Sequence, residues 1–109
     1  MKEEDMIASL QMYNQQLQNV LMQKQTLMIQ SKEIERALEE LDKAQNEVYK
    51  SIGPILVKRS KEEIKQELQE NKEEIEIKLK ALERQESRVK EKLKESQEHF
   101  QALNIGTGG

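Results

Sequence analysis

Cysteine is absent from this sequence of 109 residues, and the aromatic residues are only two tyrosines and one phenylalanine. Without cysteine there is no disulfide framework, no thiolate metal site and no cysteine nucleophile. Aromatic and aliphatic side chains fill compact cores, so a dense globule is not expected here. A thin apolar stripe barely offsets the ~1.5 kcal/mol that ordering each residue costs, so we expect the fold to depend on partner chains.

Long apolar runs and an excess of one charge are also missing. No apolar run approaches the ~18 residues of a membrane span, so no membrane association is expected. The acidic first five residues lack the basic-then-apolar order of a signal peptide, which predicts a cytoplasmic protein. Acidic residues number 21 and lysine plus arginine 18, with the two signs interspersed. The resulting net charge of −3 argues against nucleic acid as the main partner.

Nothing in the sequence indicates catalysis or cofactor binding. His99 is the only histidine, and Glu95 and Glu98 beside it make a weak metal site. The glycine-rich residues 106–109 lack the Lys-Ser/Thr pair of a P-loop. Glutamates on convex helical surfaces have no cleft that would shift their pKa values. We therefore predict a protein that is not an enzyme and has no cofactor.

The sequence does contain a regular apolar period in each half. The first seam consists of Met6, Leu10, Tyr13, Leu17, Val20, Lys24, Leu27, Ser31, Ile34, Leu38 and Leu41. The second seam consists of Leu68, Lys72, Ile75, Leu79, Leu82, Glu86, Val89, Leu93, Ser96, Phe100 and Leu103. Steps of four and three residues alternate without a slip, which is typical of a coiled coil. The period predicts helices over about residues 4–45 and 60–104.

The boundaries of these helices carry local signals. Ser60 followed by Glu63 is a capping box, in which the serine hydroxyl accepts a hydrogen bond from the first turn of the second helix. The glycine-rich residues 105–109 predict a disordered tail. We expect residues 1–109 to form a single domain.

Lys24 and Glu86 interrupt the two seams with opposite charges. If the chain folds back near residue 53, the two side chains reach the same level and could pair across the seam to set the helix register. In the alternative interpretation, both side chains extend to water. Lys90 follows Glu86 at the favoured i,i+4 spacing for a further ion pair.

The segment at about residues 47–59 is rich in β-branched residues and has Gly53-Pro54 at its centre, which predicts a β-hairpin. Gly53 supplies the positive φ of a type II′ turn, and the fixed φ of Pro54 suits the second position. A lone hairpin is marginally stable in water and leaves two unpaired edges, so we expect hairpins of several chains to assemble into a β-barrel body. The residues predicted to form this oligomer contact are Val48, Tyr49, Ile52, Gly53, Pro54, Ile55, Leu56 and Val57. The predicted class is mainly α, a long antiparallel two-helix coiled coil joined by one β-hairpin.

Residues 48–58 closely resemble the hairpin signature of the archaeal-type prefoldin β-subunit family, and residues 23–25 and 82–86 resemble its helical segments. The resemblance implies an ATP-independent molecular chaperone subunit, a holdase without cofactor. Its partners would be prefoldin α-type subunits, in a hetero-hexamer of two α-type and four β-type chains. The tips of its coiled-coil arms would capture unfolded proteins and pass them to a group II chaperonin.

All five methionines lie in the first 28 residues, and methionine is unbranched and polarisable, which suits a surface that binds many shapes. In a helical hairpin this region shares the open end of the arm with the C-terminal residues. The predicted client-binding residues are Met1, Met6, Ile7, Leu10, Phe100, Leu103 and Ile105. Met12 and Met22 lie off the seam, so the partner helix does not fully cover them. Alternatively, the end residues only close the coiled coil.

A coiled-coil scaffold or adaptor that binds one fixed partner is the alternative function. Such a scaffold would keep the open end of the arm polar, whereas a chaperone needs apolar side chains there. The number of unrelated unfolded proteins that bind would separate these two functions.

Overall fold

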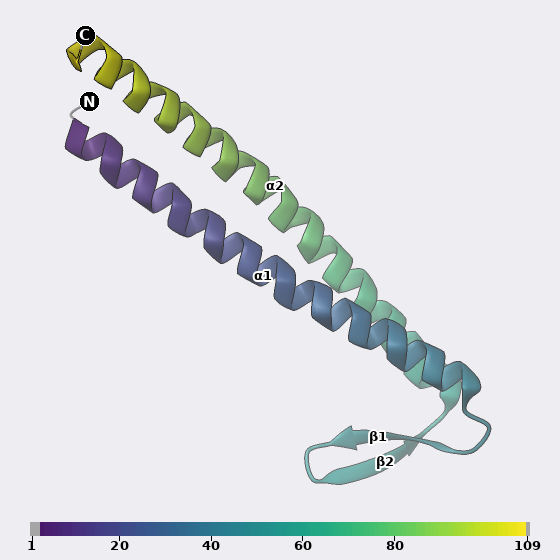
Figure 1. Cartoon of the computed structure of the whole chain (residues 1–109). Helices are drawn as coiled ribbons and strands as arrows, with labels where there is room; N and C mark the ends of the chain where they lie inside the picture. Colours follow the sequence, from purple (N-terminus) through teal and green to yellow (C-terminus); the bar gives the residue numbers. More distant parts are fainter. Residues whose placement is uncertain (1–2, 109) are drawn as a thin grey trace. The chain divides into compact units, whose positions relative to one another are not determined.

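A computed structural model describes the backbone of residues 3–108 and the side chains of residues 3–103. The elements are α1 (Glu3–Lys43), β1 (Val48–Ile52), β2 (Ile55–Arg59) and α2 (Lys61–Gly108), as Figure 1 shows. The predicted class, two long helices joined by a single β-hairpin, is confirmed. The β-barrel concerns an assembly of several chains and stays a prediction.

The chain divides into two compact units, which are described separately. The terminal unit contains the residues up to Gln25 and those from Lys80 onward, and the hairpin unit is Thr26–Leu79. Within each unit, a segment of α1 lies antiparallel to a segment of α2. Among residues 3–108, neither helix has a stretch that is both long and apolar enough to cross a membrane.

The seams account for the packing within both units. Every position of the first and second seams is buried or half-buried, and most positions between them are exposed. The buried core of the terminal unit is Met6, Val20, Leu82 and Val89, and that of the hairpin unit is Leu41 and Ile75. Val20 is the most enclosed, with 1% of its surface exposed. The coiled-coil period of the sequence is therefore also the pattern of burial.

The turn of the hairpin follows the local chemistry of its two residues. β1 and β2 pair antiparallel with Ile52 opposite Ile55, so the loop contains only Gly53 and Pro54. Gly53 has a φ of 55°, in the left-handed region that favours glycine. Because proline holds its own φ negative, the pair has the φ signs of the predicted type II′ turn.

The start of α2 is capped as predicted. The backbone N–H of Glu63 donates to the Ser60 hydroxyl oxygen at 3.1 Å. Glu62 and Glu63 lie in the first turn, where carboxylates interact favourably with the helix dipole. These local interactions fix the residue at which the hairpin ends and α2 begins.

The other helix ends differ in length from the prediction. α1 ends at Lys43, where the Ala44 N–H donates to the Leu41 carbonyl at 3.2 Å and tightens the last turn. α2 continues to Gly108, into the stretch where the sequence predicts a disordered tail. No proline lies in this stretch, and glycine lowers helix propensity by about 1 kcal/mol without removing a backbone donor.

Candidate functional site

The hairpin presents two faces with different surroundings. Its register places Val48, Lys50, Ile52, Ile55, Val57 and Arg59 on one face, and Tyr49, Ser51, Leu56 and Lys58 on the other. A hollow of about 480 Å³ lies between β1 and the adjoining parts of α1 and α2. Its apolar lining includes Leu41, Val48, Ile64 and Leu68. The single chain therefore leaves unfilled apolar space beneath its hairpin.

The predicted oligomer contact is largely uncovered. Of its eight residues, Val48 and Val57 are half-buried and the other six are exposed. Leu56 has 70% of its surface exposed, and it lies in the same two strands as the exposed Ile52 and Ile55. The sheet formed by residues 48–59 has only two strands, so each strand has one edge without a neighbouring strand. Apolar side chains and open edges together form a surface that a further strand can cover.

A polar network crosses the hairpin face that carries Tyr49 and Lys58. Lys58 Nζ donates to Oε1 of Glu47 at 2.6 Å, and the Tyr49 hydroxyl donates to Oε2 of Glu47 at 2.9 Å. Tyr49 and Lys58 are register partners, so Glu47 links both strands at the base of the hairpin. The hydrogen bond from Lys58, and to a smaller extent the one from Tyr49, lowers the pKa of the Glu47 carboxyl. The sequence reasoning missed this network.

A second ion pair ties the opposite hairpin face, which carries Lys50, to α2. Lys50 Nζ lies 2.9 Å from Oε2 of Glu67, and this hydrogen bond lowers the pKa of Glu67. At the same end, Lys61 Nζ donates to the carbonyl oxygens of Asp42 at 3.2 Å and Ala44 at 3.4 Å. A cation from α2 thus satisfies carbonyl groups at the C-terminus of α1. Both interactions hold the hairpin base, and neither has a local sequence signal.

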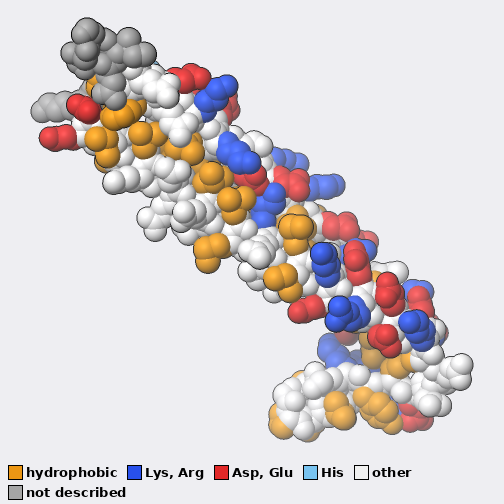
Figure 2. Space-filling model, viewed as in Figure 1, with side chains coloured by type: hydrophobic (Ala, Val, Ile, Leu, Met, Phe, Trp, Pro, Cys, Tyr) orange, Lys and Arg blue, Asp and Glu red, His pale blue; other side chains and the backbone are white. Residues whose placement is uncertain are grey.

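In the terminal unit, α1 has a neutral segment over residues 6–23 that contains no charged residue. Four large apolar side chains are exposed on it: Ile7, Met12, Leu21 and Met22. Met22 is 66% exposed and Met12 is 49% exposed, as their positions off the seam predict. The α2 residues of the same unit expose many charged side chains, including Lys94 and Glu98. Figure 2 shows this asymmetry as orange and white side chains over α1 and charged ones over α2.

The predicted client-binding residues are shielded to different degrees. Ile7 is exposed, whereas Met6 is buried, and Leu10, Phe100 and Leu103 are half-buried in the seams. Met1 and the side chain of Ile105 lie outside the described residues. A hollow of about 220 Å³ lies here between the helices, lined by Met6, Ser9, Tyr13, Glu95, Ser96 and His99. Small serines in this part of the helices leave it incompletely packed.

The charged seam positions of the terminal unit pair with each other, as in the first of the two interpretations of Lys24 and Glu86. Lys24 Nζ lies 2.7 Å from Oε1 of Glu86, and Lys90 Nζ lies 2.7 Å from Oε2. The Lys24 and Glu86 side chains are only 21% and 14% exposed. The hydrogen bond from Lys24, and to a smaller extent the one from Lys90, lowers the pKa of Glu86 from 4.5 to about 2. The hydrogen bond to Glu86 raises the pKa of Lys24, so both groups are charged at neutral pH.

Comparison with known proteins identifies the family. The sequence profile of the prefoldin subunit family matches residues 4–105. The crystal structure of the prefoldin beta subunit from Thermococcus strain KS-1 has a TM-score of 0.86 and 39% identity, covering 93% of this chain and 90% of that chain. The prefoldin beta2 subunit from the same strain shares the fold, with a TM-score of 0.73 and 20% identity over 82% of this chain and 97% of that one. No curated protein sequence matches.

The match to the family profile spans nearly the whole chain, and the beta subunit match is high in both identity and coverage. The resemblance inferred from the hairpin residues is thereby confirmed. The family consists of chaperones and is not a family of enzymes. This chain belongs to the prefoldin family and is a chaperone subunit with the fold of a prefoldin β subunit.

Proposed function

We propose that the chain is an ATP-independent holdase subunit that captures unfolded polypeptides and passes them to a group II chaperonin in the cytoplasm. It acts within a hetero-hexamer of two α-type and four β-type prefoldin subunits. Its hairpin joins the β-barrel body of that hexamer, and the terminal unit contacts the client. Membership of the prefoldin family supports the role as a whole.

The observation that carries the proposal is the exposed apolar surface on the neutral segment of α1. Met12, Leu21 and Met22 are exposed within a stretch that has no charged residue. An unfolded polypeptide presents apolar side chains in no fixed arrangement, so a surface that holds it must adapt its shape. Flexible methionines provide such adaptation, and the absence of charge removes the cost of desolvating ions.

The client-binding residues at the open end remain Met1, Met6, Ile7, Leu10, Phe100, Leu103 and Ile105. Ile7 is already exposed, and the seam residues beside the 220 Å³ hollow become accessible when the helix ends separate. Incomplete packing lowers the cost of that local opening. The hairpin supplies the oligomer contact through its exposed Tyr49, Ile52, Ile55 and Leu56, together with its open strand edges.

The experiment uses the chain assembled with an α-type subunit and a chemically denatured client whose aggregation is followed by light scattering. Substituting the exposed set Ile7→Gln, Met12→Gln and Met22→Gln should raise several-fold the amount of hexamer needed to suppress aggregation. A matched variant on α2, Lys80→Gln, Lys94→Gln and Glu98→Gln, should leave that amount unchanged. Equal suppression by both variants contradicts the assignment of this surface to client binding.

Removal of residues 1–9 and 101–109 tests the open end separately. The truncated chain should still assemble through its hairpin while its suppression of aggregation falls. Full suppression at the same stoichiometry would show that these residues only close the coiled coil. Binding of several unrelated unfolded proteins supports the holdase, whereas binding of one native protein alone supports a scaffold.

A further inference from the structure

Within the terminal unit, Lys24 and Glu86 are the only charged residues in the seams. The neighbouring seam residues include Leu17 and Val20 on α1 and Leu82 and Val89 on α2, all of them apolar. Two leucines in place of the ion pair would fit the apolar period of both helices. Replacing a shielded ion pair by apolar residues is often neutral or stabilising, so stability alone does not account for this pair.

The apolar period leaves the register of the helices underdetermined. Because both seams repeat every seven residues, a slip of one heptad again matches apolar positions with apolar positions. The slip carries Lys24 to the level of Leu93 in one direction, and Glu86 to the level of Leu17 in the other. Each case places a charge among apolar side chains without its partner. Only the observed register joins Nζ of Lys24 to Oε1 of Glu86 at 2.7 Å.

The same charges bear on which helix α1 packs against. From Met6 to Ser31, Lys24 is the only charged residue of α1. If this stretch packed against its counterpart in a second copy of the chain, Lys24 would meet no carboxylate. Such packing would bury the exposed side chains of Met12 and Met22, which favours it. A charge that is left unpaired in that arrangement disfavours it.

We infer that the Lys24–Glu86 ion pair selects α2 of the same chain as the partner of α1 and fixes the register between them. Lys90 assists, because its ammonium lies 2.7 Å from the second oxygen of Glu86 and holds the carboxylate in place. The shifted pKa values of Lys24 and Glu86 agree with a pair that is charged on both sides. The role goes beyond the proposed client capture, because it concerns the folding of the arm and not what the arm binds.

The absence of cysteine allows a direct distance measurement. Exposed Gln11 on α1 and Arg84 on α2 are replaced by cysteine and spin-labelled. The labelled chain is diluted with unlabelled chain in the assembled protein, so that pulsed dipolar spectroscopy reports distances within one molecule. A slip of one heptad shifts the labels by about 10 Å along the axis, at 1.5 Å per residue. If α1 packs against a helix of another chain, the two labels of one chain no longer lie on paired helices, and the short intramolecular distance between them is lost.

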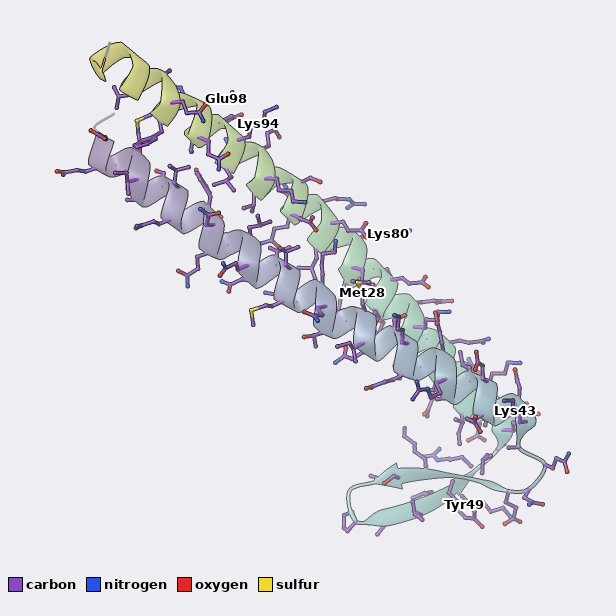
Figure 3. All side chains as sticks on the ribbon, viewed as in Figure 1. Met28, Lys43, Tyr49, Lys80, Lys94 and Glu98 are labelled. Carbon is purple, nitrogen blue, oxygen red and sulfur yellow. The ribbon has the colours of Figure 1, made fainter. Side chains whose placement is uncertain are left out.

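The labelled protein with Lys24 and Glu86 intact should give one distance between the labels. Lys24→Leu with Glu86→Leu should retain helicity but split the distribution, with a second peak shifted by about 10 Å or a loss of the intramolecular signal. The charge reversal Lys24→Glu, Glu86→Lys and Lys90→Glu should restore one peak. Lys94→Leu with Glu98→Leu, at two exposed positions of α2 that Figure 3 labels, is the matched control and should keep one peak.

A single parent-like distance in the double leucine variant would overturn the inference. The inference would also be overturned if the charge-reversal variant kept a split distance distribution, because the effect would then arise from packing and not from charge. Neither result depends on client binding, so a failure here is distinguishable from a failure of the proposed holdase role.

Discussion

The ammonium of Lys50 on β1 lies 2.9 Å from the carboxylate of Glu67 on α2, which ties the hairpin to the helix that follows it. Both side chains are partly exposed, and exposed ion pairs contribute little to stability. The pair does limit the directions in which the hairpin can point. The proposed assembly through the hairpin needs a defined direction, so the pair should affect oligomer formation more than folding.

Glu67→Gln is therefore expected to leave the thermal unfolding midpoint nearly unchanged and to weaken assembly with α-type subunits several-fold. Sedimentation velocity over a range of concentrations measures the assembly, and circular dichroism measures the midpoint. Glu74→Gln, an exposed glutamate on the same helix, is the control. If both variants assemble alike, the Lys50 contact does not orient the hairpin.

Gly53→Ala should destabilise the hairpin by about 1 kcal/mol, because a left-handed φ costs an L-residue roughly 1–2 kcal/mol. No atom lies within 4 Å of the position that the alanine Cβ would occupy, so the cost arises from the backbone and not from a clash. Gly53→Asn should cost less, because asparagine tolerates this region better. Chemical denaturation of the three proteins measures the difference, and equal stabilities would argue against a left-handed residue in this turn.

Local rules made much of the fold predictable. The seams follow from the period of apolar residues, which itself determines which side of each helix is shielded. The turn follows from the conformations available to Gly53 and Pro54, and the start of α2 from the hydroxyl of Ser60. For Lys24 and Glu86 the sequence offered pairing as one of two interpretations, because two helices joined by a short hairpin bring together positions at similar distances from the turn.

The polar contacts around the hairpin base were not predictable in this way. Lys50 and Glu67 are 17 residues apart, as are Ala44 and Lys61, and belong to different elements. Their contact depends on the direction in which the strands leave the helices, and no periodicity in the sequence encodes that direction. The helical bounds of α2 reach Gly108, and the glycines near this end carry no stop signal as strong as a proline.

Val20→Ala should lower the free energy of unfolding by roughly 2 kcal/mol. Val20 is 1% exposed, so truncation removes buried apolar surface and leaves a small cavity in the terminal unit. Met12→Ala, at an exposed position outside the seam, should change stability by no more than about 0.5 kcal/mol. Urea denaturation of both variants measures the contrast. A similar loss in both would mean that the seam is not the core of this unit.

Acid should remove the contribution of Glu86 to stability. Its pKa is about 2 in the folded chain and 4.5 ordinarily, because Lys24 and then Lys90 donate hydrogen bonds to the carboxylate. A group whose pKa is lowered by folding stabilises the fold above its ordinary pKa and loses that effect as pH falls towards the folded pKa. The contribution is therefore complete above pH 4.5 and declines between 4.5 and about 2.

The difference in unfolding free energy between the parent and Glu86→Gln isolates this contribution from those of the other carboxyls. It should be constant well above pH 4.5 and shrink steadily towards pH 2, as measured by urea denaturation at each pH. Lys90→Gln removes one of the two donors to Glu86, so in that background the decline should be smaller and should end at a higher pH. A difference that stays flat across this range would mean that Glu86 does not retain its charge-assisted hydrogen bonds in solution.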